Sequence, residues 1–326
     1  MALAVATKSV DADYLPIPVD LIFLSRFNGV AFYVKEGNDK DAGLRLYRGA
    51  DYPFEEADLV KLRNSNRSKL YISIDDHHRF QGDLRDNLSD ILDYESVDVK
   101  SRFSSLNEVM RSVLGDTFSR NDDDETVRIT NEFARDTVNL VCRDDATPRD
   151  LCKVLYHDYY TFTHSTNVSV YCVMLAKQLG ANEQELQAVA AGGLLHDLGK
   201  LGIAEKILLK PGRLTDEEFG VIKRHPTIGF ANLCKREDLS FGQLMMVYQH
   251  HECPDGSGYP VGCVDREIHD WARICAVADV FEALTSNRPY RSRLPISEAL
   301  SIMDRYSGGG LDAEVLQCWK TIICEE

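Results

Sequence analysis

Hydrophobic positions change their spacing along the chain, and the change separates two differently built parts. Before residue 95, short strand-like runs alternate with turn formers: VAFYV at Val30–Val34, LRLY at Leu44–Tyr47 and KLYISI at Lys69–Ile74. Between the last two runs, FEEADLVKLRN has the spacing of a short helix. Because such runs are typical of half-buried strands, residues 1–95 are predicted to form a small α+β module.

The next segment, residues 96–149, is predicted to be a helical linker. It is interrupted by the acidic cluster NDDDE at Asn121–Glu125. Because a block of like charges repels itself and avoids a packed interior, this cluster is expected to be a solvated bend.

Helical periodicity dominates from residue 150 to residue 326. The segment HSTNVSVYCVMLAKQLG places Val168, Cys172 and Leu175 at helical spacing and ends at Gly180. Similar periodicity occurs in NEQELQAVAAGGLLHDLGK, FGQLMMVYQHH and WARICAVADVFEALTS. These segments predict a set of amphipathic helices.

The segment TDEEFGVIKRHP carries signals for both ends of a helix. Thr215–Glu218 has the pattern of a capping box, and Pro226 is expected to stop the helix just after His225. Short loops between helices, with no convincing strand, indicate an all-α domain. The predicted fold class is therefore an α+β two-domain chain with an all-α helical bundle at its C-terminus.

Composition and charge narrow the kinds of partner. No apolar run is long enough to span a bilayer and no signal peptide is evident, so a cytoplasmic protein without membrane contact is expected. Nine cysteines without a CxxC pair fit reduced thiols in that compartment. The net charge of −15 lacks the basic footprint of DNA- or RNA-binding proteins. An anionic ligand would therefore need local cations or metal ions.

Histidines and aspartates gather on the helical segments, most of them at helix ends. Burying this many imidazoles without partners would be costly. A lone histidine on an apolar helix is more often a satisfied core residue than a ligand, but several histidines with two carboxylates suit a pair of transition-metal ions. The seven candidate ligands are His164, His196, Asp197, His225, His250, His251 and Asp279.

The motifs around these residues occur in a recognisable order: YTFTHSTN, LLHDLGKLGI, KPGRLTDEEF, IKRHPTIG, HHECPDGSGYP and VADVFEALTSNRPYRSRL. In this order they resemble the HD-GYP family of HD-domain phosphohydrolases, over roughly residues 150–320. An isolated HD pair occurs in many chains, whereas the long GYP motif in register with the downstream RPYR is highly specific.

The resemblance implies an HD-type helical bundle that hydrolyses cyclic di-GMP, a bacterial second messenger. It implies a metal-dependent phosphodiesterase that forms linear pGpG, with further hydrolysis to GMP left open, through a hydroxide held between two metal ions. In the implied ligand set, Asp197 bridges the two metals. His164, His196 and Asp279 complete one site, and His225, His250 and His251 complete the other.

Two positions depart from the family pattern. Some members hold a third metal with a glutamate where this chain has Tyr160, so two divalent transition metals are expected, iron first and manganese as the alternative. Glu282 stands where many members have aspartate. This second departure concerns the placement of neighbouring cations and leaves the metal core as implied.

The resemblance also assigns roles outside the ligand set. Asp197 and Lys200 are the implied catalytic residues, with Lys200 as a point charge near the scissile phosphate. Lys200, Arg288, Arg291 and Tyr259 are the expected substrate contacts, since the arginine fork suits both phosphate and guanine. Of these, Tyr259 is equally compatible with a packing role.

Two alternatives to this function stay open on the sequence. The protein could be a slow receptor for cyclic di-GMP that signals through its N-terminal module, or a phosphodiesterase for another cyclic dinucleotide. Residues 1–95 carry no metal, nucleotide or nucleophile motif. A module in this place suggests, by analogy, regulation through ligand binding or through docking of a signalling partner, and the plainer interpretation is a packing or homodimerisation module without a ligand.

Overall fold

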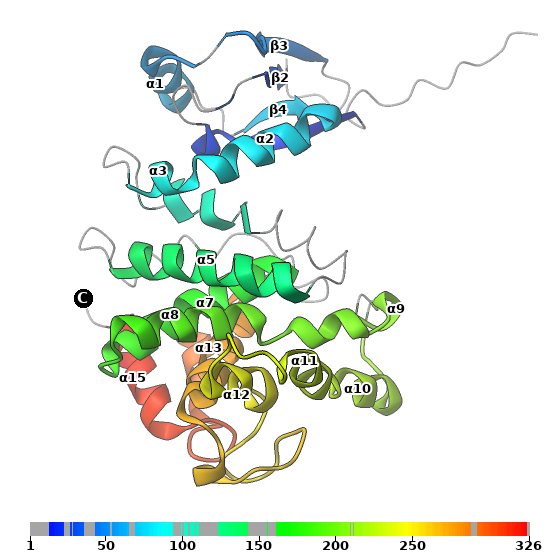
Figure 1. Ribbon diagram of the computed structural model, residues 1–326, viewed down its shortest axis with the longest axis vertical. Helices are drawn as coiled ribbons and strands as arrows, with labels where there is room; N and C mark the ends of the chain where they lie inside the picture. The colour runs from blue at the N-terminus through cyan, green and yellow to red at the C-terminus, as the bar shows by residue number, and fades with distance from the viewer. Residues whose placement is uncertain are drawn as a thin grey trace, which may run out of the picture. The chain divides into compact units, whose positions relative to one another are not determined.

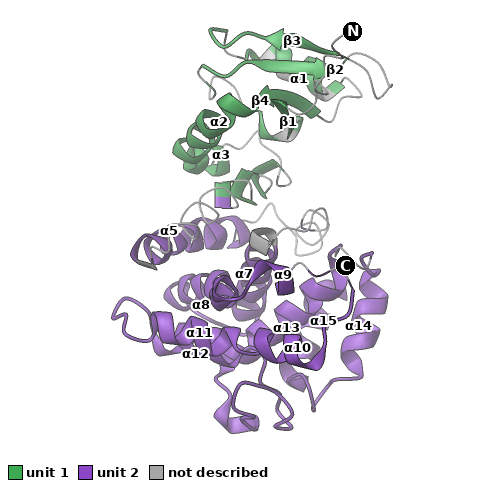
Figure 2. Ribbon diagram, turned by 90° about the vertical axis from the view of Figure 1, so that its right-hand side faces the viewer, with its two compact units in different colours: residues 1–109 green, residues 110–326 purple. Residues whose placement is uncertain are grey.

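A computed structural model gives the fold in two compact units, Met1–Val109 and Met110–Glu326 (Figure 2). The residues that it describes are 13–22, 27, 29–35, 43–52, 54–64, 69–93, 99, 101–103, 105–107, 109–110, 123–142, 155, 161–208, 210, 212–287 and 292–324. The predicted domain boundaries at residues 95 and 149 stay a prediction.

Unit 1 contains a four-stranded antiparallel sheet with the strand order β1-β4-β2-β3 (Figure 1). The strands are β1 (Tyr14–Pro18), β2 (Phe32–Lys35), β3 (Leu44–Arg48) and β4 (Lys69–Ser73). The three strand-like runs of the sequence correspond to β2, β3 and β4. With the helices α1 (Glu56–Asn64), α2 (Ile74–Asp86) and α3 (Leu88–Asp93), they confirm the predicted α+β module.

The hydrophobic pattern does not predict β1, because this strand contains Pro16 and Pro18. Proline lacks the N–H that a central strand needs, but it is tolerated at a sheet edge, which is where β1 lies. Ile74 likewise begins α2 instead of ending a strand, since the Ser73 side chain accepts a hydrogen bond from the Asp75 N–H and caps the helix.

Aromatic rings form part of the core of unit 1. The rings of Phe27 and Phe80 stack with centroids 4.6 Å apart, and Phe32 meets Phe54 edge to face at 5.1 Å. All four side chains are buried, together with Ile72 of β4. Their packing joins the sheet to α2.

Every regular element that the structure describes in unit 2 is a helix, which confirms the predicted all-α region. Helix α7 packs against α8 and α13, and α12 packs against α8 and α13 as well (Figure 1). The α-helices are α5 (Asp123–Cys142), α7 (Thr161–Gln178), α8 (Glu183–Leu195), α9 (Glu205–Leu208), α10 (Asp216–Ile222), α11 (His225–Leu233), α12 (Phe241–Gln249), α13 (Asp270–Thr285), α14 (Ile296–Asp304) and α15 (Ala313–Cys324). Among the described residues, no helix combines the length and apolar character that crossing a bilayer requires.

The expectation of a solvated bend at the acidic cluster is wrong for its described part. Asp123 begins α5, and the carboxylates of Asp124 and Glu125 lie in its first turn. Carboxylates are stabilising there because they face the positive end of the helix dipole. Glu125 also pairs with Arg128 at 2.6 Å. Helix α5 packs against α7 and α8 within unit 2.

Candidate metal centre

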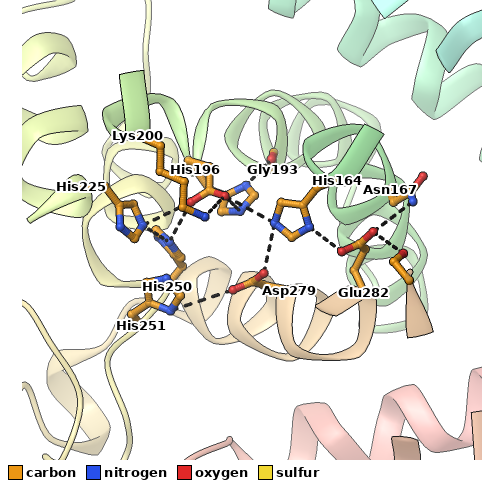
Figure 3. A network of polar contacts seen from close by, with 12 residues as sticks. His164, Asn167, Gly193, His196, Lys200, His225, His250, His251, Asp279 and Glu282 are labelled. Carbon is orange, nitrogen blue, oxygen red and sulfur yellow. Dashed lines mark hydrogen bonds and ion pairs between the residues drawn. The ribbon is translucent and has the colours of Figure 1, made fainter. Parts of the chain in front are cut away.

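His164 reaches the interior of unit 2 from one stripe of α7. Its side chain is almost fully buried, and Val168, Cys172 and Leu175 on the same stripe are fully buried. Residues at this spacing share one face of a helix, which is why the sequence places the histidine inward. Figure 3 shows its ring pointing toward the other candidate ligands.

His196 and Asp197 lie where α8 ends. The helix begins with a capping box between Asn182 and Glu185 and ends with His196 as its C-cap. Asp197 then starts a short 3-10 helix, η3 (Leu198–Gly202). The change from one helix to the next lets two adjacent side chains reach one centre, and both are buried.

Gly199 holds η3 against the helix that carries His225. A Cβ atom at Gly199 would lie 1.9 Å from the backbone oxygen of His225 and 2.6 Å from the nitrogen of Gly229. No side chain fits in that space, so the glycine permits direct backbone packing of η3 on α11. This contact brings Asp197 next to His225.

His225 begins a helix, which corrects the expectation that Pro226 ends one. The capping box of Thr215 and Glu218 is present as predicted, but α10 ends at Ile222 and α11 starts at His225. Proline is favoured in the first turn of a helix because its missing N–H has no partner there anyway. The stop signal in the sequence is therefore a start signal for the next helix.

His250 and His251 follow the last residue of α12. His250 is the C-cap and is buried, whereas the His251 side chain keeps 25% of its exposure. The backbone leaves the helix at this point, and the centroids of the two rings lie 4.2 Å apart. Both adjacent rings thus face the same centre (Figure 3).

The structure brings all seven candidate ligands together in two groups. One ligand atom from each member of a group lies within 4.8 Å of every other. The first group is His164, His196 and Asp279, and the second is Asp197, His225, His250 and His251.

Asp197 lies between the two groups. Its Oδ1 atom is 3.2 Å from Nε2 of His225, and its Oδ2 atom is 3.4 Å from Nε2 of both His164 and His196. Each carboxylate oxygen therefore faces a different group, which is the geometry that a bridging ligand needs.

Hydrogen bonds on the outer side of the rings fix the orientation of four histidines. In each ring, Nδ1 points away from the centre toward an oxygen. The partners are Glu282 Oε2 for His164 (2.5 Å), Gly193 O for His196 (2.7 Å), Ile222 O for His225 (2.8 Å) and Met246 O for His250 (2.9 Å). A carbonyl oxygen only accepts hydrogen bonds. In His196, His225 and His250, Nδ1 is therefore the protonated atom and Nε2 is left with a lone pair.

A cation satisfies these inward-facing atoms best. The Nε2 atoms of His225 and His250 lie 3.1 Å apart, so two lone pairs face each other. Nε2 of His196 and Oδ1 of Asp197 are buried without a hydrogen-bond partner. Such atoms are costly inside a protein unless a proton or a metal ion binds them. Imidazole nitrogens with carboxylate oxygens suit divalent transition metals.

The electrostatics of the pocket keep the carboxylates ionised. Burial alone would raise the pKa of Asp197, but Lys200, His196 and His164 outweigh it and hold that pKa well below its usual range. In the same way, burial opposes ionisation of Asp279, and contacts with His164 and His251 lower its pKa well below the usual value. Both residues are therefore present as anions, the form that binds metal.

The histidine pKa values divide by surroundings. Burial and neighbouring imidazoles lower the pKa of His250 well below the ordinary value, and burial lowers that of His251 to about 3. These two rings stay neutral, as ligation requires. At His164, burial opposes the charge, but Glu282, Asp197 and Asp279 outweigh it and raise the pKa. The three carboxylates around His164 therefore favour a positive charge at this place, whether that of a protonated ring or that of a bound cation.

A protein-family model described as HD domain matches residues 150–315, which is half of the chain and contains the whole cluster. The chain belongs to the HD-domain family. The match confirms the HD-domain part of the resemblance drawn from the motifs.

Relatives of this HD domain carry names of cyclic-dinucleotide phosphodiesterases. The cyclic di-GMP phosphodiesterase PA4108 of Pseudomonas aeruginosa is 39% identical over 158 residues, covering 48% of this chain and 38% of that protein. The 3'3'-cGAMP-specific phosphodiesterase 1 of Vibrio cholerae is 43% identical over 160 residues, covering 48% of this chain and 36% of that protein. The chain thus spans well under half the length of these relatives.

A solved structure shares the fold over nearly the whole chain. Bd1817, an HDG"Y"P protein from Bdellovibrio bacteriovorus, matches with a TM-score of 0.65 at 21% identity. The match covers 95% of this chain and 99% of that one. The HD domain and the small sheet module are therefore both parts of a known architecture.

Glu282 belongs to the HD domain site, although the sequence motifs do not assign it a role. It is buried, binds Nδ1 of His164, and accepts further hydrogen bonds from Ser286 at 2.5 Å and Asn167 at 3.3 Å. Its signal in the sequence is its position one turn after Asp279 on a largely apolar helix. A carboxylate in this place fixes the tautomer of a ligand and strengthens it.

The loop after His251 is anchored by a second buried carboxylate, Glu252. Its oxygens accept hydrogen bonds from the backbone N–H groups of Val261, Gly262 and Cys263 at 2.7–3.2 Å. Glu252 therefore closes the loop, because three N–H donors converge on one carboxylate.

Three further residues shape this loop. Asp255 braces it, since its Oδ1 accepts hydrogen bonds from the N–H and the hydroxyl of Ser257. Gly256 has the positive φ of 78° that favours glycine. Gly258 does not need such a φ. It is required because a Cβ there would lie 2.4 Å from the Cys253 nitrogen.

The remaining predicted residues lie around the cluster or outside the described residues. Lys200 is partly exposed and forms an ion pair with Asp197. The Tyr259 ring lies 4.7 Å from that of His251, centroid to centroid. Arg288, Arg291 and Tyr160 lie outside the described residues. Metal ligation by the seven residues, and substrate contact by the others, remain predictions.

Proposed function

We propose that this HD domain is a metal-dependent phosphodiesterase that hydrolyses cyclic di-GMP to linear pGpG. The observation that carries the proposal is the convergence of imidazole nitrogens on Asp197, whose two oxygens face two separate ligand groups. The names of the relatives support the choice of a cyclic dinucleotide.

The ligand groups would hold two divalent cations, His164, His196 and Asp279 around one and His225, His250 and His251 around the other, with Asp197 shared. Such cations lower the pKa of water toward neutrality and offset the charge of a phosphodiester. Iron is the first expectation and manganese the alternative, because imidazole and carboxylate ligands suit both.

The chain's own residues contribute position and charge. The Lys200 ammonium pairs with Asp197 and is partly exposed, so it can meet a phosphoryl oxygen at the edge of the centre. Glu282 keeps His164 oriented, and Tyr259 is proposed to line the substrate beside His251. Arg288 and Arg291 remain proposed contacts to phosphate or guanine.

The test is a product analysis under reducing conditions. Purified protein is loaded with iron(II) or with manganese and incubated with cyclic di-GMP, and the products are separated by chromatography. Formation of pGpG supports the proposal, and later appearance of GMP shows a second hydrolysis. The described cysteines are all free thiols, which is consistent with the cytoplasmic location that we propose.

Two outcomes would overturn the proposal. Tight binding of cyclic di-GMP without turnover would identify a receptor that signals through residues 1–95. Much faster hydrolysis of 3'3'-cGAMP would identify a different substrate, an alternative favoured by the 43% identity to a phosphodiesterase of that specificity. Running both dinucleotides with the same metal-loaded sample separates these cases.

A further inference from the structure

Lys223, just after the end of α10, lies over two aromatic rings beside the metal centre. Its Nζ atom is 4.9 Å from the centroid of the Phe219 ring and 5.2 Å from that of Tyr259. The Tyr259 ring is tilted by 32° against that of His251, with 4.7 Å between centroids. One aromatic ring therefore separates this ammonium group from a predicted metal ligand.

The charge of Lys223 is held differently from that of two lysines nearby in the sequence. Lys200 pairs with Asp197, and Lys210 pairs with Glu218 at 2.6 Å. Within the described residues, Lys223 contacts aromatic faces and has no carboxylate within ion-pair distance. An ammonium group over ring faces keeps its N–H donors for another electron-rich group.

The surroundings of this lysine suit a purine base. Phe219 is 45% exposed and Tyr259 is half-buried, so part of each ring can be reached by a ligand. Bases stack on aromatic side chains. Guanine also presents O6 and N7 side by side as acceptors, the pair to which lysine binds, whereas adenine has an amino group in place of O6.

We infer that Lys223, together with Phe219 and Tyr259, binds a guanine base of the substrate and makes the site prefer guanine to adenine. The inference rests on the proposed function, because it takes a cyclic dinucleotide as the substrate. With one phosphate at the metal centre, a base lies far enough away to reach a group one ring beyond His251. Lys223 is then a specificity residue, and the metal ligands are unaffected by its replacement.

The test compares Lys223→Met with a matched control, Lys235→Met. Lys235 is exposed and lies just after the C-terminal end of α11, whereas His225 begins that helix. Each metal-loaded variant is assayed on cyclic di-GMP, on cyclic di-AMP and on bis(p-nitrophenyl) phosphate, which has no base. For Lys223→Met we expect kcat/KM on cyclic di-GMP to fall about ten-fold, through KM. The kcat/KM of Lys223→Met on the other two substrates should change less than about two-fold, and so should the kcat/KM of Lys235→Met on all three.

Equal losses on both dinucleotides would overturn the inference, because the lysine would then serve a phosphate. An unchanged KM for cyclic di-GMP, or the same fall in Lys235→Met, would also overturn it. If the wild-type protein hydrolyses none of the three substrates, the proposed function fails instead. Calorimetric titration of cyclic di-GMP into wild type and Lys223→Met then decides the role of Lys223, with weaker binding to the variant expected.

Discussion

The carboxylate of Glu282 accepts a hydrogen bond from Nδ1 of His164, with 2.5 Å between the two atoms. Replacing Glu282 by Ala removes the group that orients this ligand, so metal affinity should fall by about 10- to 100-fold. The metal affinity of Glu282→Gln should lie between those of the wild type and Glu282→Ala, since its amide oxygen can still accept the hydrogen bond. Metal content after dialysis against graded chelator measures the effect.

Glu298→Ala is the control for that experiment, because Glu298 is an exposed carboxylate on α14. It should retain metal like the wild type. Equal retention in Glu282→Ala would show that the hydrogen bond to His164 has no part in metal binding.

Asp197 and Asp279 should differ in how much of the centre they support. Asp197 lies within 3.4 Å of histidines of both ligand groups, whereas Asp279 lies 3.2 Å from His164 of the first group and 3.9 Å from His251 of the second. We expect Asp197→Asn to lose metal from both groups and to lose activity, and Asp279→Asn to keep one ion per chain. Elemental analysis of the purified proteins gives the stoichiometry, and full loading of Asp197→Asn would rule out its bridging role.

Lys200 should affect turnover without affecting metal loading. Removing a group that stabilises developing charge costs roughly 100- to 1,000-fold in kcat for comparable donors. We expect Lys200→Ala to approach the lower end of that range while binding the same amount of metal. Lys210→Ala, whose partner is Glu218, serves as the control. Loss of metal in Lys200→Ala would mean that its pairing with Asp197 is structural.

Gly199 should tolerate no side chain. A Cβ there would lie 1.9 Å from the His225 oxygen, so Gly199→Ala must push η3 away from α11. Overpacking of this kind costs about 1–3 kcal/mol of unfolding free energy. Metal should be lost as well, because Asp197 and His225 separate. Gly220→Ala on α10, where nothing lies within 4 Å of the added atom, should be neutral or slightly stabilising. Thermal unfolding compares the two.

Asp312 should contribute stability that depends on pH. Burial alone would raise the pKa of Asp312, but hydrogen bonds from the Val315 N–H and from Arg273 outweigh it and lower that pKa. A carboxyl with a depressed pKa in the folded state contributes its full stabilisation above its unfolded pKa of about 3.9, and this stabilisation is lost as the pH falls from that value through the lower folded pKa.

Asp312→Asn should therefore lower the unfolding free energy at pH 7 and reduce its dependence on pH below about 4. Asp312→Ala should cost about 1 kcal/mol more, because it also removes the cap of α15. Denaturant titrations across that pH range give both values. An unchanged acid limb in Asp312→Asn would contradict the assignment.

Sequence patterns predicted the parts of the fold in which local spacing and packing agree. The stripe of His164 and Val168 on α7 is such a case, because period and burial coincide. Local signals failed where tertiary context decides. Pro16 and Pro18 argue against a strand unless β1 is known to lie at the edge of the sheet. Pro226 lies in the first turn of a helix, although in the sequence alone it is interpreted as the end of one.

The candidate metal ligands could be predicted from the sequence, whereas the residues that contact the ligands and the loop around them could not. His250 and His251 are visible because adjacent imidazoles at a helix end are unusual. Glu282, Glu252 and Lys223 are single charged residues in the sequence, and each acquires a role only through contacts with residues or rings brought near by folding.

In the proposed centre the two ligand groups share Asp197, and this sharing would affect how the metal ions load. A first ion would change the charge and the orientation of a ligand that the second ion also needs. The two binding events are then linked, and a titration of the metal-free protein should depart from the curve for two equal, independent sites.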